Sequence, residues 1–458
     1  MRNKEKNATM TPMSTLSPQP YKGTRDYYPE DKRVQNYIFN TWRKVVQLHG
    51  YEEYGAPMLE PLEVYTAKSG QELAGEQTYA FTDRGDRVVA IRPEMTPSIS
   101  RMVAGRRQEL GYPARLFSIA NFMRYERPQR GREREFWQLN TDIFGVDGPM
   151  PEAEIIGLAA EIMKAFGATN DMFTIRINNR KLIDFTMGQY LGLDAVQAQM
   201  MIKLFDRKNK ISPEDFRDHA AEIFGAEKSP RGLQQIAVLI AAKSMNDLPE
   251  ELRTSAAARE VQELFQLLEQ AGVKNAVFDS TLMRGLDYYT GTVFEVFDTD
   301  PQNNRSLFGG GRYDGLVGLF GAEPIGTVGM APGLTTTELF LQSHNLLPKL
   351  VSTTEVGIVV LNNTYSAALK LAQNLREEGV NVEVDITGRK LEKQIKAVIK
   401  KNIPFMIFVG EDEVSSGIYM FKDTMTAQEE KLSFERIVSK VKDRRHISDD
   451  DEFAVFFD

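Results

Sequence analysis

Hydrophobic and polar positions repeat with two different periods along the chain, and these periods outline its elements. Residues 31–49 carry apolar side chains at helical spacing, which predicts a helix. Residues 96–105 predict a second helix, with Thr96 as its N-cap. Residues 78–92 predict a hairpin, and residues 115–125 and 135–144 predict a longer one.

The strand expected at 135–144 has two chemically different faces, because successive side chains of a strand point in opposite directions. One face is mostly polar and carries Phe136, Gln138, Asn140 and Asp142. The other is mostly apolar and carries Trp137, Leu139, Thr141 and Ile143. A polar face of this kind either faces water or forms the floor of an active site, and alternation alone leaves both readings open.

The balance of periods changes along the chain and predicts an α+β organisation. Helix-forming residues dominate the middle of the sequence, strand character and glycines return after it, and a βαβα rhythm follows. We expect a disordered N-terminal extension (1–20), a core in two parts (21–170 and 276–348), a helical insertion (171–275), a C-terminal α/β domain (353–443) and an acidic tail (446–458).

Composition excludes several kinds of chemistry. The absence of cysteine rules out disulfides, thiol nucleophiles and thiolate metal sites. The four histidines are far apart, no P-loop pattern occurs, and no protein-held metal is predicted. No apolar run approaches the length of a membrane span, and no secretion signal is evident, so we expect a cytoplasmic chain without membrane contact.

The segment RYERPQRGREREF (124–136) places five arginines in a chain of formal net charge -8. Guanidinium groups match phosphate oxygens bidentately. The spacing alone fits a nucleotide site, a solvated loop or a nucleic-acid contact. The neighbours favour a nucleotide, because Phe136 could stack on a base and Glu126 could accept a hydrogen bond from its amino group.

Five motifs, in order, resemble those of histidyl-tRNA synthetases, a family of class II aminoacyl-tRNA synthetases. They are KGTRDYYPED, VVAIRPEMTPSISRMVAG, FMRYERPQRGREREFWQLNTDIFG, RGLDYYTGTVFE and GGGRYDGL. The resemblance runs from about residue 21 to 443. It implies a class II antiparallel sheet with flanking helices, a C-terminal anticodon-binding domain, and a homodimer with residues 31–61 at its interface.

The same resemblance implies an activity and its substrates. The family activates histidine with ATP to histidyl-adenylate and transfers the histidyl group to the 3′ end of tRNA(His), with Mg²⁺ on the outer phosphates. By resemblance, Arg124 holds the α-phosphate, Glu126 the adenine amino group and Arg132 the outer phosphates, while Phe136 stacks on adenine. Arg284 faces the α-phosphate and stabilises the charge that develops there.

The resemblance also implies a histidine site. Glu94 and Thr96 would hold the α-amino group, Gln138 would bind near the polar end, Asp142 and Tyr289 would face the imidazole, and Tyr288 and Tyr313 would shape the pocket. A carboxylate paired with a tyrosine hydroxyl suits an imidazole, which has one donor and one acceptor nitrogen.

One departure from the family pattern concerns the ATP site. In VGMAPGLTTTELFL, Thr336 stands where the family has the arginine of motif 3, and Pro332 replaces an apolar residue. Another arginine, Arg305 or Arg312, could substitute for it. The alternatives are a slow or inactive enzyme, a synthetase-like histidine-binding or regulatory protein, or a nucleic-acid-binding scaffold.

The segment RKLEKQIKAVIKK predicts a basic helix in the C-terminal domain. Lys390, Lys393, Lys396 and Lys400 lie along one side, and Leu391, Ile395, Val398 and Ile399 along the other. Such a face is either simply solvated or contacts tRNA phosphates without reading sequence.

Overall fold

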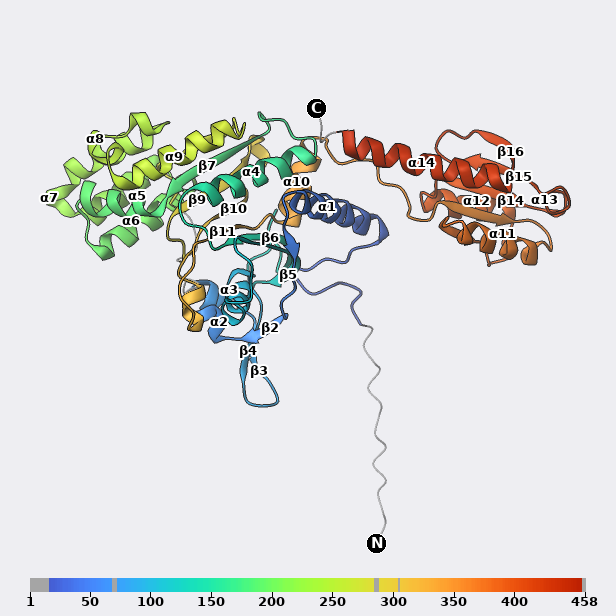
Figure 1. Cartoon of the computed structure of the whole chain (residues 1–458), viewed down its shortest axis with the longest axis horizontal. Helices are drawn as coiled ribbons and strands as arrows, with labels where there is room; N and C mark the ends of the chain where they lie inside the picture. The colour runs from blue at the N-terminus through green and yellow to red at the C-terminus, as the bar shows by residue number, and fades with distance from the viewer. Residues whose placement is uncertain (1–15, 68–71, 284–287, 304, 455–458) are drawn as a thin grey trace, which may run out of the picture.

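Three bodies of secondary structure make up the protein, as the computed structural model in Figure 1 shows: a large sheet with helices, a helical module and a C-terminal α/β domain. The structure describes residues 16–67, 72–283, 288–303 and 305–454. Most of the predicted disordered extension, residues 1–15, therefore lies outside the described residues. Within the described ranges, no helix combines the length and the apolar character needed to cross a membrane.

The large sheet has eight strands in the order β1-β5-β6-β11-β10-β9-β7-β8. Its strands are β1 (Glu52–Glu53), β5 (Ala114–Met123), β6 (Glu135–Phe144), β7 (Phe173–Asn179), β8 (Ala276–Phe278), β9 (Thr292–Asp298), β10 (Ser306–Arg312) and β11 (Thr327–Met330). The six inner strands are antiparallel, and only the two edge pairs are parallel. The predicted antiparallel sheet with flanking helices is confirmed.

Three helices cover one face of this sheet, namely α1 (Pro29–Leu48), α4 (Met150–Ala165) and α10 (Leu334–Ser343). Their apolar side chains share one core with Leu139 and Ile143 of β6. The ring of Trp137 lies 5.4 Å from that of Phe39 on α1, measured between centroids. The apolar face of β6 therefore points into the core, as the alternation predicted, and the polar face of β6 points away from it.

A small three-stranded sheet lies beside the large one, in the order β2-β4-β3. It comprises β2 (Leu59–Pro61), β3 (Ala80–Thr82) and β4 (Val88–Ile91), with α2 (Glu63–Thr66), a π-helical turn (Glu72–Gln77) and α3 (Thr96–Gly105) adjoining it in the chain. Helix α3 begins at Thr96, and its N-cap is Met95 rather than the predicted Thr96. Thr96 lines the cavity described below.

The helical module has a core of its own, separate from that of the large sheet. Its elements are α5 (Arg180–Phe185), a π-helical turn (Thr186–Tyr190), α6 (Ala195–Arg207), α7 (Pro213–Ala241), α8 (Glu250–Arg253) and α9 (Ala256–Gln270). The predicted boundary at residue 171 was wrong, because β7 belongs to the large sheet and pairs with β9. Phe173, Ile175 and Ile177 of β7 are fully buried, which is the two-residue period of a strand.

The C-terminal domain is a five-stranded sheet in the order β13-β12-β14-β15-β16. Its elements are β12 (Val356–Val360), α11 (Tyr365–Glu377), β13 (Val382–Val384), α12 (Leu391–Lys400), β14 (Phe405–Val409), α13 (Glu411–Ser416), β15 (Ile418–Asp423), β16 (Glu429–Ser433) and α14 (Phe434–Ala454). Helix α14 extends into the predicted acidic tail (446–458), of which 455–458 lie outside the described residues. The start of α14 is anchored by Ile437 and Val441, which are buried in the domain core.

Candidate active site

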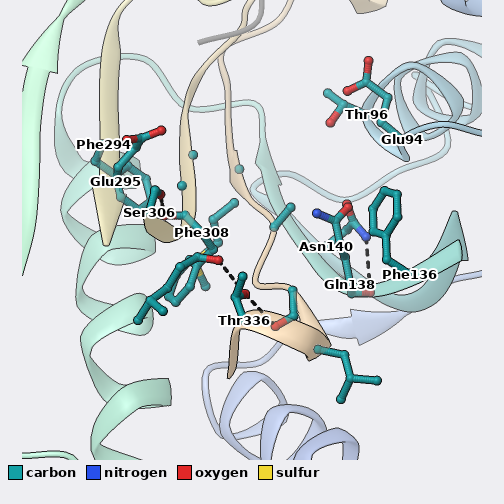
Figure 2. Close-up of a pocket in the computed structure, with 18 of the residues that line it drawn as sticks. Glu94, Thr96, Phe136, Gln138, Asn140, Phe294, Glu295, Ser306, Phe308 and Thr336 are labelled. Atoms are coloured by element: carbon teal, nitrogen blue, oxygen red, sulfur yellow. Dashed lines mark hydrogen bonds between the residues drawn. The ribbon is translucent and has the colours of Figure 1, made fainter. Parts of the chain in front are cut away.

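A cavity of about 430 Å³ opens over the polar face of β6. Every predicted ATP- or histidine-site residue that the structure describes lines it: Glu94, Thr96, Arg124, Glu126, Arg132, Phe136, Gln138, Asp142, Tyr288, Tyr289 and Tyr313. Figure 2 shows Glu94 and Thr96 on one side, with Phe136, Gln138 and Asn140 rising from β6. The predicted residue Arg284 lies outside the described residues.

Strand β6 forms much of the floor, and its register explains which side chains meet there. Asp142 pairs with Leu116 of β5 on one side and with Gly329 of β11 on the other. A Cβ atom at position 329 would stand 2.0 Å from Oδ1 of Asp142, and one at position 311 would stand 2.9 Å from the Tyr289 ring. Glycine at these two positions therefore leaves room for the side chains of Asp142 and Tyr289 at this end of the cavity.

Two carboxylates at this end are each held by a tyrosine. The Tyr313 hydroxyl donates to Oδ1 of Asp142, and the Tyr288 hydroxyl donates to Oε2 of Glu94 at 3.0 Å. Burial raises the pKa of Asp142 to about 7, although the Tyr313 hydrogen bond acts in the opposite direction. Asp142 is therefore protonated more readily than an exposed aspartate.

The other end of the cavity carries the guanidinium groups. Nε of Arg124 donates to the Pro93 carbonyl at 2.8 Å, and its guanidinium carbon lies 5.2 Å from the centroid of the Phe136 ring. Arg132 and Glu126 pair with each other, with Nη1 3.1 Å from Oε2. A nucleotide that bound both residues would have to replace this ion pair with contacts of its own.

The five arginines of the 124–136 segment do not act together. Arg124 and Arg132 line the cavity, whereas Arg134 is buried and donates to the Tyr21 hydroxyl at 2.8 Å. Arg130 points toward the β9–β10 connection, where Nη2 donates to Oδ1 of Asn303 at 3.2 Å. These four of the five arginines thus differ in surroundings: Arg124 and Arg132 face this cavity, Arg130 lines a neighbouring one, and Arg134 is structural.

Comparisons with known proteins agree with this geometry. The family model described as Histidyl-tRNA synthetase matches residues 23–336, and the one described as Anticodon binding domain matches residues 355–444. The chain belongs to the histidyl-tRNA synthetase family. This confirms the resemblance found in the sequence motifs.

Individual members of the family are similar over nearly the whole chain. The Histidine--tRNA ligase of Leptospira biflexa is 41% identical over 430 residues, which cover 93% of this chain and 98% of that protein. The Histidine--tRNA ligase of Haloarcula marismortui is 36% identical, over 88% of this chain and 92% of that protein. The crystal structure of histidyl-tRNA synthetase from Nostoc sp. PCC 7120 superimposes with a TM-score of 0.79 at 25% identity, covering 94% of this chain and 100% of that one.

Thr336, the departure from the family pattern, lies at the wall of the cavity near the start of α10. Its hydroxyl donates to the Leu307 carbonyl of β10 at 2.7 Å. Arg312 was one of the two predicted substitutes, and that expectation was wrong. Arg312 is buried and makes two 2.7 Å bonds to the carboxylate of Glu152, so its charge is already neutralised away from the cavity.

Sequence reasoning left several polar residues of the cavity wall out of the predicted site, among them Asn140, Glu295 and Ser306. Asn140 lies on the polar face of β6, and Glu295 and Ser306 stand on β9 and β10 (Figure 2). Alternation had placed Asn140 on the same face as Gln138 and Asp142, which was sufficient to include it in the site. Glu295 was detectable as a lone carboxylate in the apolar strand TVFEVF.

The polar residues of the cavity fit Mg²⁺ only as a partner of bound phosphates. Among the described residues, no group of three or more metal-binding side chains is close enough to hold an ion. Mg²⁺ usually keeps several waters and takes one or two carboxylates together with substrate phosphates. Glu295, which lines the cavity, could supply such a carboxylate oxygen.

In the C-terminal domain, the four predicted lysines of α12 are exposed, with Lys390 at its N-cap. The opposite face differs from the prediction, because Leu391 and Ile399 are exposed. Gln394 is buried in their place. Its Nε2 donates to the Val360 carbonyl at 3.0 Å and its Oε1 accepts from the Val360 N–H at 2.9 Å.

Proposed function

We propose that the protein is an ATP-dependent histidine–tRNA ligase. The observation that carries this proposal is one continuous cavity with an imidazole-suited end, formed by Asp142, Tyr313 and Tyr289, and a guanidinium end beside Phe136. The curated relatives reported above are named as ligases. None of the observations favours the regulatory alternative.

In the first step, a carboxylate oxygen of histidine attacks the α-phosphorus of ATP. The bond from that phosphorus to the oxygen bridging to the β-phosphate breaks, and pyrophosphate leaves with the electron pair. Arg124 stabilises the charge on the α-phosphate, and Phe136 stacks on adenine. Arg284 is proposed for the opposite side of the α-phosphate on the family pattern alone.

The amino acid is oriented by the other end of the cavity. Glu94 accepts from the α-ammonium group with Thr96 beside it, and Gln138 binds near the same polar end. The Asp142 carboxylate accepts from one imidazole nitrogen, and the Tyr289 hydroxyl donates to the other. Histidine is selected because an apolar analogue could not donate a hydrogen bond to the buried Asp142 carboxylate.

In the second step, a ribose hydroxyl at the 3′ end of tRNA(His) attacks the histidyl carbonyl, and AMP leaves. The hydroxyl proton passes to the departing phosphate or to water. The exposed lysines of α12 would contact the tRNA backbone, a contact that positions the tRNA without reading its sequence. Bound Mg²⁺ would neutralise charge on the outer phosphates of ATP.

We also propose a homodimer with residues 31–61 at the interface, acting in the cytoplasm, where tRNA is used. Three large apolar side chains on this segment are exposed in the single chain: Leu48, Met58 and Leu59. A partner subunit would remove them from water, which is favourable by about 25 cal/mol for each Å² of apolar surface buried. We propose, separately, that the predicted insertion (171–275) is the helical module, whose first helix is α5.

Histidine-dependent exchange of labelled pyrophosphate into ATP tests the proposed function. Exchange is expected with histidine and Mg²⁺ present, and none when histidine is omitted or replaced by another amino acid. It should need no tRNA, because the first step is reversible on its own. Folded protein that binds histidine but catalyses no exchange would instead support the regulatory alternative.

The raised pKa of Asp142 makes histidine binding depend on pH. As the pH falls below about 7 the carboxyl becomes increasingly protonated, and a neutral carboxyl is a weaker acceptor for the imidazole N–H than a carboxylate. The KM for histidine in the exchange reaction is therefore expected to fall as pH rises from about 6 to 8. It should level off at higher pH, because by then both the Asp142 carboxyl and the free imidazole, whose pKa is about 6.5, have lost their protons.

The variant Asp142→Asn supplies the control for this pH dependence. It should bind histidine more weakly, and its remaining pH dependence should follow the single ionisation of the free imidazole. A wild-type profile no steeper than that of Asp142→Asn would show that Asp142 does not titrate in this range.

A further inference from the structure

Thr336 occupies the position where the family pattern has the motif 3 arginine, and its side chain carries no charge. Its hydroxyl is bonded to the Leu307 carbonyl, which ties the start of α10 to β10 (Figure 2). Thr336 lines the cavity described above and also a neighbouring one of about 850 Å³. A cation reaching this wall must therefore come from another element.

The neighbouring cavity lies between the β9–β10 part of the large sheet and the helical module. It shares the wall residues Gly131, Arg132, Leu282, Glu295, Ser306, Leu307 and Thr336 with the first cavity. Six cationic side chains line it: Arg130, Arg132, Arg176, Lys208, Lys210 and Arg305. The two cavities thus meet where the outer phosphates of ATP are proposed to lie.

Most of these cations already have an acidic neighbour. Ion pairs join Arg132 to Glu126, Arg176 to Asp279 and Lys210 to Asp206, and Lys208 lies within electrostatic reach of Asp279. Arg130 and Arg305 differ, because the hydrogen-bond partner of each is a neutral side-chain amide. Among the described residues, neither is in ion-pair contact with a carboxylate.

Arg130 and Arg305 link the arginine-rich loop to the β9–β10 connection in opposite directions. Nη2 of Arg305 donates to Oε1 of Gln129 at 2.9 Å, while Arg130 reaches back to Asn303. Arg305 is the residue before β10, and Leu307 two positions later accepts the Thr336 hydroxyl. Its guanidinium is thus anchored to the arginine-rich loop, and it lines the neighbouring cavity together with Thr336.

We propose that Arg305 supplies the guanidinium that Thr336 lacks and binds the outer phosphates of ATP from β10 instead of from α10. Gln129 holds Arg305 in the absence of nucleotide, and the phosphate oxygens replace this neutral acceptor with a charged one. The inference rests on the proposed function, because it names a further ATP-binding residue of the same site.

The test compares ATP and AMP binding by isothermal titration calorimetry, with Mg²⁺ and without histidine. Arg305→Ala is expected to weaken ATP binding by about 10- to 100-fold, the range for losing a hydrogen bond to a charged group. AMP binding should change less than about threefold, because AMP has no outer phosphates. Lys210→Ala is the matched control, since Lys210 lines the same cavity but is paired with Asp206.

A second variant restores the charge from the other element. Arg305→Ala combined with Thr336→Arg should recover ATP affinity to within a few-fold of the original, and the KM for ATP in pyrophosphate exchange should follow. Equal ATP affinities for Arg305→Ala and Lys210→Ala would overturn the inference, and so would a parallel loss of ATP and AMP binding. Absence of exchange in the unaltered protein would count against the proposed function instead, because the ATP-to-AMP comparison requires no catalysis.

Discussion

Replacing Arg124 by alanine is expected to slow histidine-dependent pyrophosphate exchange by about 100- to 1000-fold, the usual effect of removing one preorganised donor at a developing negative charge. The side chain is held for this role by its bond to the Pro93 carbonyl and by the face of Phe136. The loss should appear mainly in kcat, because charge on the α-phosphate grows in the transition state. Initial rates over a range of ATP concentrations measure it.

Two further variants separate this effect from general damage. Arg124→Lys keeps the charge but loses the planar guanidinium fork, so its exchange rate should fall between those of the unaltered protein and Arg124→Ala. Arg87→Ala removes an exposed arginine of the β3–β4 hairpin and should leave exchange unchanged. A less than tenfold effect of Arg124→Ala would remove this residue from the proposed α-phosphate site.

The buried ion pair of Arg312 and Glu152 predicts the largest effect on stability. Arg312 also donates to the carbonyls of Val146 and Gly148, so it joins β10 to the connection before α4. Arg312→Ala would leave the Glu152 carboxylate buried without its main partner. We expect this to lower the free energy of unfolding by about 3–5 kcal/mol.

Urea unfolding followed by tryptophan fluorescence can measure this loss, because both tryptophans of the chain, Trp42 and Trp137, lie in the large-sheet body. Arg43→Ala breaks the exposed pair with Glu53 and should cost at most about 1 kcal/mol. Replacing Arg312 and Glu152 together by leucine should recover part of the loss. If Arg312→Ala were no worse than Arg43→Ala, the pair would not hold these elements together.

What the sequence predicts depends on how local each feature is. Alternation on β6 placed Gln138 and Asp142 on one face, because a strand fixes side-chain direction residue by residue. The same period was present in β7 and was overlooked beside a long helix-rich region. The pairing of Arg132 with Glu126 depends on how a loop folds back on itself, and no periodic pattern encodes it.

The substitution at Thr336 illustrates a different limit. The motif comparison located the missing charge and offered Arg305 and Arg312 as replacements on nearness in sequence. Only the fold separates them, because it buries Arg312 against Glu152 and leaves Arg305 bonded to a neutral amide. Distinguishing a structural arginine from a ligand-binding one required knowing the partner of each.

The position of β11 has a consequence for how the chain matures. It is the last strand of the large sheet to be synthesised, yet it lies between β6 and β10. Until it leaves the ribosome, those two strands have unpaired edges that can recruit strands of other nascent chains. The helical module, with a core built from nearby residues, can fold during that interval. The sheet that carries the adenylation site is therefore complete only after the four-residue strand β11 has been synthesised. A translational pause after β11 would favour correct strand pairing over aggregation.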